Sequence, residues 1–130
     1  MKETLLRSET RRVEVLSSCC AIGWAILLFG PWNLLHPPQY QALRQIVPAG
    51  ISPEVWWGAI QAALGLLGML SLVRGWQSGR MAALFLQGGV WAAVFASFVE
   101  YQQVLTGMVT YSVLAGSCMV AFATLWRGRN

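Results

Sequence analysis

Four long apolar runs, separated by short polar segments, dominate the hydrophobic pattern of the chain. None of them contains Asp, Glu, Lys, Arg or His, and they cover Val15–Leu35, Val55–Val73, Met81–Val99 and Val104–Trp126. The second and third runs have 19 residues each. At a rise of about 1.5 Å per residue, such a helix spans roughly 28 Å, close to the ~30 Å hydrocarbon core of a bilayer. The pattern predicts an all-α integral membrane four-helix bundle.

The two central runs are joined by a short basic turn, Arg74–Arg80. Because this turn is too short to hold a domain, we expect an antiparallel membrane hairpin. A soluble bundle would need a polar stripe along every helix, and these runs have none. We therefore expect residues 1–130 to form a single transmembrane domain.

The segment between the first and second runs has its own pattern. Proline at Gly30-Pro31 should kink or stop the first helix, because it removes a backbone donor and clashes with the preceding turn. Residues 39–47 then place apolar and polar side chains on opposite helical faces, which predicts a short helix lying flat on the membrane. Ser52-Pro53-Glu54 combines an N-cap residue, proline at the first helical position and an early acid, so it predicts the start of the second span.

The composition agrees with a membrane protein and points away from a disulfide or metal site. Only 11% of the residues are charged, against about 25% in typical soluble domains, and 56% are hydrophobic. The three cysteines, Cys19, Cys20 and Cys118, are odd in number and fall within the apolar runs, so we expect small buried side chains at helix contacts. His36 lies at the far end of the first run from Cys19 and Cys20, and we expect neither a bound metal nor a cofactor.

The basic residues predict the orientation. Eight of the nine lie at the two termini and in the central turn, and only Arg44 lies on the other side. By the positive-inside rule both termini and the central turn face the cytoplasm. The basic balance indicates anionic lipid headgroups as partners rather than nucleic acid. The expected headgroup contacts are Arg11, Arg12, Arg74, Arg80, Arg127 and Arg129.

Few residues are candidates for chemistry. Glu54 and Glu100 fall at the outer interface, where they either pair to hold a cation or proton or are solvated charges at helix ends. Gln61 and Gln87 are the most polar residues inside the runs, and buried amides in lipid seek hydrogen-bond partners. Their heights differ by roughly 10 Å at the rise per residue, so we expect separate partners, either within the chain or on another copy. Because no ionisable or nucleophilic groups converge, we expect no enzyme.

Small residues are dense along the last three runs, and they allow close approach of helices within one bundle or between copies. One combination of residues carries a resemblance: Trp57-Gly58, Gly65, Arg74-Gly75, Arg80, Trp91 and Thr106-Gly107-x-x-x-Tyr111-x-x-Leu114-Ala115. It resembles small four-helix membrane proteins of tailed bacteriophages that are often labelled holin-like, over most of residues 40–125. The resemblance implies a phage or bacterial inner-membrane setting. The number of spans departs from most established holins, which have one to three.

Two functional hypotheses follow. In the first, which we favour because of the small size, the small-residue helix faces and the lack of catalytic groups, the chain forms holin-like homo-oligomers that permeabilise the cytoplasmic membrane. In the second, it is a non-enzymatic accessory protein that binds a membrane-protein partner or acts in phage superinfection exclusion. The lack of a polar stripe for a water-filled lumen favours the second.

Overall fold

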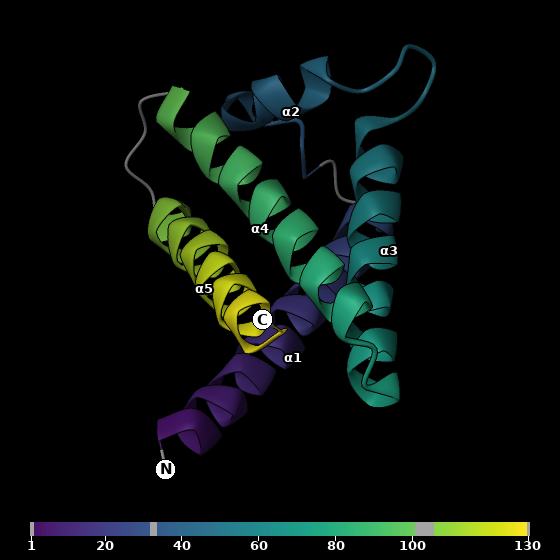
Figure 1. Cartoon of the computed structure of the whole chain (residues 1–130). Coiled ribbons are helices and arrows are strands. Elements are labelled where there is room, and N and C mark those ends of the chain that lie inside the picture. The colour runs from purple at the N-terminus through teal and green to yellow at the C-terminus, as the bar shows by residue number, and fades with distance from the viewer. Residues whose placement is uncertain (1, 32–33, 101–105, 130) are drawn as a thin grey trace.

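The computed structural model describes residues 2–31, 34–100 and 106–129, and every long element in them is helical. In chain order the elements are α1 (Lys2–Phe29), the 3₁₀ helix η1 (Pro38–Tyr40), α2 (Gln41–Gln45), α3 (Pro53–Arg74), α4 (Gln77–Glu100) and α5 (Thr106–Arg129) (Figure 1). Four of these, α1, α3, α4 and α5, are long and apolar enough to cross a membrane. The predicted all-α architecture is confirmed at this level.

The first helix differs from its predicted bounds. It begins at Lys2 instead of Val15, and its candidate span runs over Arg7–Phe29. The charged segment continues the helix, with an Arg12–Glu9 pair one turn apart on its exposed side. The helix ends at Phe29, directly before Gly30-Pro31, as the proline predicted. Residues 32 and 33, inside the first apolar run, lie outside the described residues.

The last helix extends further at its C-terminal end than predicted. The expected span was 104–126, whereas the candidate span covers Val109–Arg129 within α5. Residues 104 and 105 lie outside the described part of the chain. The helix continues through Arg127 and Arg129, because basic side chains interact favourably with the negative end of a helix dipole.

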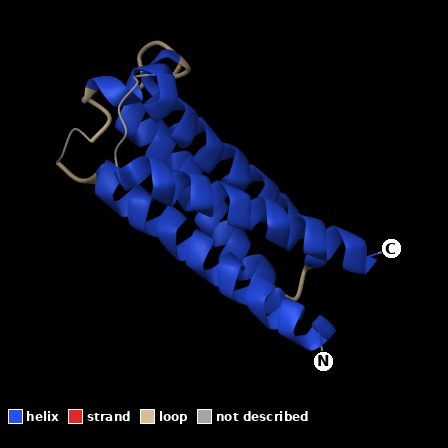
Figure 2. Cartoon of the chain, turned by 90° about the vertical axis from the view of Figure 1, so that its left-hand side faces the viewer, coloured by secondary structure: helices blue, strands red, loops and turns tan. Residues whose placement is uncertain are grey.

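The four long helices form an antiparallel bundle with both termini at one end. Helix α1 packs mainly on α3, and α4 packs mainly on α5, with smaller contacts between α3 and α4 and between α1 and α5. Figure 2 shows the N and C termini at one end of the bundle, opposite the end that holds α2. The α3–α4 turn lies at the end with the termini, because each helix reverses the direction of the one before it. Gly75 makes this turn in the left-handed conformation, at φ 66°.

The connection between α1 and α3 covers the opposite end of the bundle. The predicted amphipathic helix over 39–47 is divided into η1 and α2. Leu43 of α2 points into the bundle and is buried. The indole Nε1 of Trp57 donates to the carbonyl of Leu43 at 2.9 Å, which fixes α2 against α3. Pro53 is the first residue of α3 and Glu54 lies in its first turn, as predicted. Ser52 precedes them, but its hydroxyl donates to Glu54 Oε2 at 2.9 Å instead of capping a backbone amide.

The buried side of α3 follows a spacing of three and four residues. Its buried positions are Trp57, Gly58, Gln61, Leu64, Gly65, Gly68 and Ser71. The glycines permit the close contact with α1, since a Cβ at Gly65 would lie 2.6 Å from Ile22 Cγ1 and 3.0 Å from the Ser18 carbonyl oxygen. Close backbone approach through small residues is the usual way that membrane helices associate.

Large apolar side chains cover the outside of the bundle. Ile26, Leu66, Leu70, Phe85, Val113 and Val120 are all more than half exposed. Helix α5 is the least covered, because only 11% of the apolar window of its span is buried, against 44% for α4. An outer surface of this kind is suited to lipid or to another helix.

Candidate functional site

The most developed polar feature is a buried network centred on Gln87 of α4, whose side chain is 1% exposed. Its amide nitrogen donates to the Leu64 carbonyl on α3 at 3.0 Å and to the Ser18 hydroxyl on α1 at 3.4 Å. Its amide oxygen accepts a short hydrogen bond from the Ser17 hydroxyl. Both N–H groups and the carbonyl of this amide are therefore used inside the bundle.

Ser17 extends the network to the fourth helix. Its oxygen accepts a bond from Trp91 Nε1 at 3.4 Å and lies 3.1 Å from the Cys118 sulfur on α5. Since the hydroxyl proton points to Gln87, the thiol is the donor in the contact with Cys118. The Ser17 hydroxyl on α1 thus contacts both α4 and α5. Its one donor and two acceptor positions are all used.

One turn before Ser17 on α1, a buried ion pair joins α1 to α4. Arg80 donates through Nε to Glu14 Oε1 at 2.9 Å and through Nη2 to Glu14 Oε2 at 2.8 Å. The side chains are 4% exposed for Glu14 and 15% for Arg80. This two-bond geometry is the strong form of an arginine–carboxylate contact. Arg80, which we expected at a lipid headgroup, instead neutralises a carboxylate inside the bundle.

The ion pair and the Gln87 network meet at Gly68. A Cβ on Gly68 would lie 3.2 Å from Gln87 Nε2 and would clash with the Ser18 hydroxyl. The gap between Glu14, Arg80, Ser18 and Gln87 is too small to hold a water molecule. The network therefore binds helices to one another and leaves no room for a substrate.

The other polar candidates have different environments. Gln61 is 1% exposed, yet its amide oxygen has no hydrogen-bond partner within the described part of the chain. Gln61 and Gln87 do not bond to each other, as their heights predicted, and Gln87 finds its partners within the chain. Glu54 bonds to Ser52, whereas the side chain of Glu100 lies outside the described residues, so their pairing stays a prediction.

Aromatic rings fill the half of the bundle beyond the Gln87 network. Trp24 makes edge contacts with Tyr40, Trp91 and Tyr111 at ring distances of 6.3, 6.0 and 5.6 Å. Trp91 stacks on Tyr111, and Phe98 contacts both tyrosines. Burial against these rings raises the pKa of Tyr40 above its ordinary value, and its hydrogen bond with Tyr111 partly offsets that effect. Trp24 and Trp91 therefore fill packing space between the helices.

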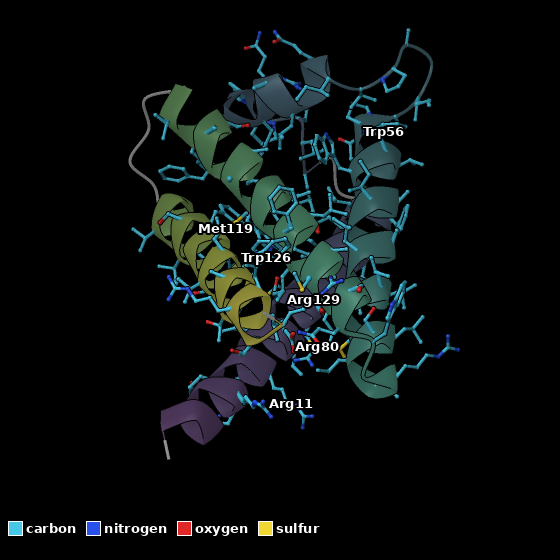
Figure 3. The ribbon with its side chains drawn as sticks, in the orientation of Figure 1. Arg11, Trp56, Arg80, Met119, Trp126 and Arg129 are labelled. Atoms are coloured by element: carbon cyan, nitrogen blue, oxygen red, sulfur yellow. The ribbon has the colours of Figure 1, made fainter. Side chains whose placement is uncertain are left out.

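The remaining predicted headgroup contacts lie at the end of the bundle with the termini. Arg11, Arg12, Arg74, Arg127 and Arg129 are exposed. Figure 3 shows Arg11, Arg80 and Arg129 toward this end, on α1, α4 and α5. Arg12 pairs with Glu9 at 3.0 Å on the surface.

The cysteines follow the prediction only in part. Cys118 is fully buried, Cys20 is half-buried, and Cys19 is exposed, so the expectation of three buried thiols is wrong for Cys19. Cys19 lies on the outer side of α1, although the residue before it, Ser18, is buried. Among the described residues, no three His, Cys, Asp or Glu side chains group as metal ligands would.

Sequence reasoning missed Glu14 and Ser17 because both precede or open the first apolar run. The spacing of small and polar residues along α1 could have indicated that these side chains are buried. The buried positions of α1 are Thr10, Glu14, Ser17, Ser18, Ala21, Ala25 and Leu28. This spacing of three and four residues continues one helical face from the apolar run back into the charged segment.

Comparison with known proteins adds no relative. No family model, curated protein or solved structure matches this chain. The resemblance to small phage membrane proteins therefore stays a prediction.

Proposed function

We propose that the protein is a polytopic protein of the bacterial cytoplasmic membrane, with both termini inside, and that it acts without catalysis as an accessory or interaction component. The observation that carries the proposal is the Gln87 network. The amide and the serines beside it bond within one chain. These polar groups are therefore not available to line a water-filled path between copies.

The proposed orientation depends on the distribution of charge. Arg11, Arg12, Arg74, Arg127 and Arg129 are exposed at the end of the bundle that holds both termini. An excess of arginine at one membrane face favours the cytoplasmic side. Cysteine labelling in intact cells tests this: a cysteine placed at Gly50 should react with an impermeant maleimide, and one placed at Gly128 should react only after lysis.

Induced expression tests the accessory role. We expect cells carrying the protein at high copy to keep their membrane potential, measured with a potential-sensitive dye, and to remain viable. Cells that also resist a second phage would point to superinfection exclusion as the accessory role. Rapid loss of potential on induction would overturn the proposal.

A second candidate is a holin-like homo-oligomer that permeabilises the membrane. The exposed side of α5 favours it, because Val109, Val113, Gly116, Val120 and Ala123 repeat at spacings of four and three residues and are exposed. Such a seam suits packing of a second helix. Particle size in mild detergent distinguishes the candidates, since a ring would support a pore and a monomer would support the accessory role.

A further inference from the structure

A cavity of about 540 Å³ lies between α1, α4 and α5 at the end of the bundle that holds the termini. This volume is in the range of small-molecule sites. Its polar lining includes Arg7 and Arg11 from α1, Gln77 and Arg80 from α4, and Thr124 from α5. Three of the nine basic residues of the chain therefore border one cavity.

The charge of this cavity comes from two of its three arginines. Arg80 is neutralised by the two bonds to Glu14. In the described part of the chain, Arg7 and Arg11 carry no ion pair. Gln77 donates to the Leu125 carbonyl at 3.3 Å, which holds the α4 and α5 walls together. Among the described residues, the cavity therefore presents two guanidinium groups that no carboxylate neutralises, Arg7 and Arg11, and such groups suit a phosphate.

A second hollow of about 420 Å³ continues from this cavity along the bundle, between α1 and α5. The two hollows share Thr10 and Thr124. The second is lined mainly by apolar or small residues, among them Val13, Val113, Gly116 and Val120. Its one acidic residue, Glu9, is paired with Arg12. A basic cavity thus opens into an apolar groove that runs toward the membrane interior.

We propose that this composite site binds one anionic phospholipid, with its phosphate between Arg7 and Arg11 and one acyl chain in the groove between α1 and α5. The inference rests on the proposed membrane location but not on the absence of a pore. Charge complementarity selects the headgroup, since basic pockets between membrane helices at the cytoplasmic face bind anionic lipids. The groove selects a lipid over a free phosphate, because only a lipid fills both parts of the site.

Native mass spectrometry of the detergent-solubilised full chain tests the headgroup. Phosphatidylglycerol and phosphatidylcholine with identical acyl chains are titrated against the wild type and the Arg7→Gln/Arg11→Gln variant. We expect a preference for phosphatidylglycerol that falls by about 30-fold in this variant, since each basic contact is worth a factor of about five. The matched control, Arg74→Gln/Arg127→Gln, removes two exposed charges outside the cavity and should keep the preference.

Filling the groove tests the acyl chain. Gly116→Leu places a side chain in the groove, whereas Gly89→Leu places one on the exposed side of α4, where nothing lies within 4 Å. We expect Gly116→Leu, and not Gly89→Leu, to lower phosphatidylglycerol retention. Glycerol 3-phosphate, which has no acyl chain, should bind both variants equally and weakly. Equal tight binding of glycerol 3-phosphate and phosphatidylglycerol would overturn the lipid assignment.

Two other results would also overturn the inference. If the wild type retains both lipids equally, the basic cavity does not select a headgroup, although the proposed function stands if membrane potential is intact. If Gly116→Leu changes the particle size and leaves lipid retention unchanged, the groove is a contact between copies. A chain released from membranes by alkaline carbonate would instead contradict the membrane location itself.

Discussion

The two halves of the bundle are held together by different interactions. In the half nearer the termini, a buried ion pair and an amide network join the helices through directional bonds between Glu14 and Arg80 and around Gln87. In the other half, Trp24, Trp91 and Tyr111 pack ring against ring. Directional bonds define which residues face each other, whereas ring packing tolerates small shifts and contributes mainly through contact area.

This difference matters for helices that are long and apolar enough to cross a membrane, as these are. Apolar side chains gain little by leaving lipid for a protein interior, so helix association depends on packing and on polar bonds. A helix pair held only by apolar contacts could slide by a turn at small cost. The Glu14–Arg80 and Ser17–Gln87 contacts fix the register of α1 against α4, and the aromatic half then packs around that register.

The largest expected effect breaks the polar half. Glu14→Ala leaves the Arg80 guanidinium buried without a partner, and we expect a loss of about 3–5 kcal/mol in the free energy of unfolding. Unfolding by SDS titration in mixed micelles measures it. The double variant Glu14→Leu/Arg80→Met removes both charges and should recover most of the loss. A double variant as unstable as Glu14→Ala would contradict the assigned ion pair.

The next effect tests the aromatic half. Trp24→Leu removes three ring contacts, and we expect a loss of about 1.5–4.5 kcal/mol, since each aromatic pair contributes about 0.5–1.5 kcal/mol. The control Trp126→Leu changes a half-exposed ring that contacts only Phe122 among the described rings, and it should cost far less. Equal losses in the same SDS titration would show that the aromatic cluster is not a distinct source of stability.

A smaller effect isolates the amide network. Gln87→Leu removes bonds to Ser17, Ser18 and the Leu64 carbonyl. We expect a loss of about 1–2 kcal/mol, because hydrogen bonds between membrane helices are each worth about 0.6–1.7 kcal/mol and Ser17 can turn to another acceptor. Unchanged stability would mean that the network orders the helices without stabilising them.

The smallest effect concerns the other buried glutamine. The amide oxygen of Gln61 has no partner among the described residues. Gln61→Leu therefore replaces a side chain that holds an unsatisfied polar atom with an apolar side chain of similar size. We expect the free energy of unfolding to stay within about 0.5 kcal/mol of the wild type, or to rise. A large loss in the Gln61→Leu variant would contradict the assignment of an unsatisfied amide oxygen at this position.

The sequence alone determined that four apolar segments form long helices and that the central pair is antiparallel. Each run such as Met81–Val99 is long enough to span a bilayer, and the short turn between α3 and α4 requires these two helices to be antiparallel. The end of α1 before Gly30-Pro31 and the start of α3 at Pro53 also followed from local chemistry, because proline restricts the backbone wherever it occurs. These features depend only on residues close together in the chain.

Only the tertiary structure decided what the polar residues do. Glu14 is separated from Arg80 by 66 residues, and Ser17 is separated from Gln87 by 70. Whether a charge near a helix end meets water, a lipid headgroup or another side chain depends on how far each helix extends and which face it turns inward. Uniformly apolar runs carry almost no preference for one face, so the pairing of α1 with α3 and the burial of Arg80 arise only when the four helices pack.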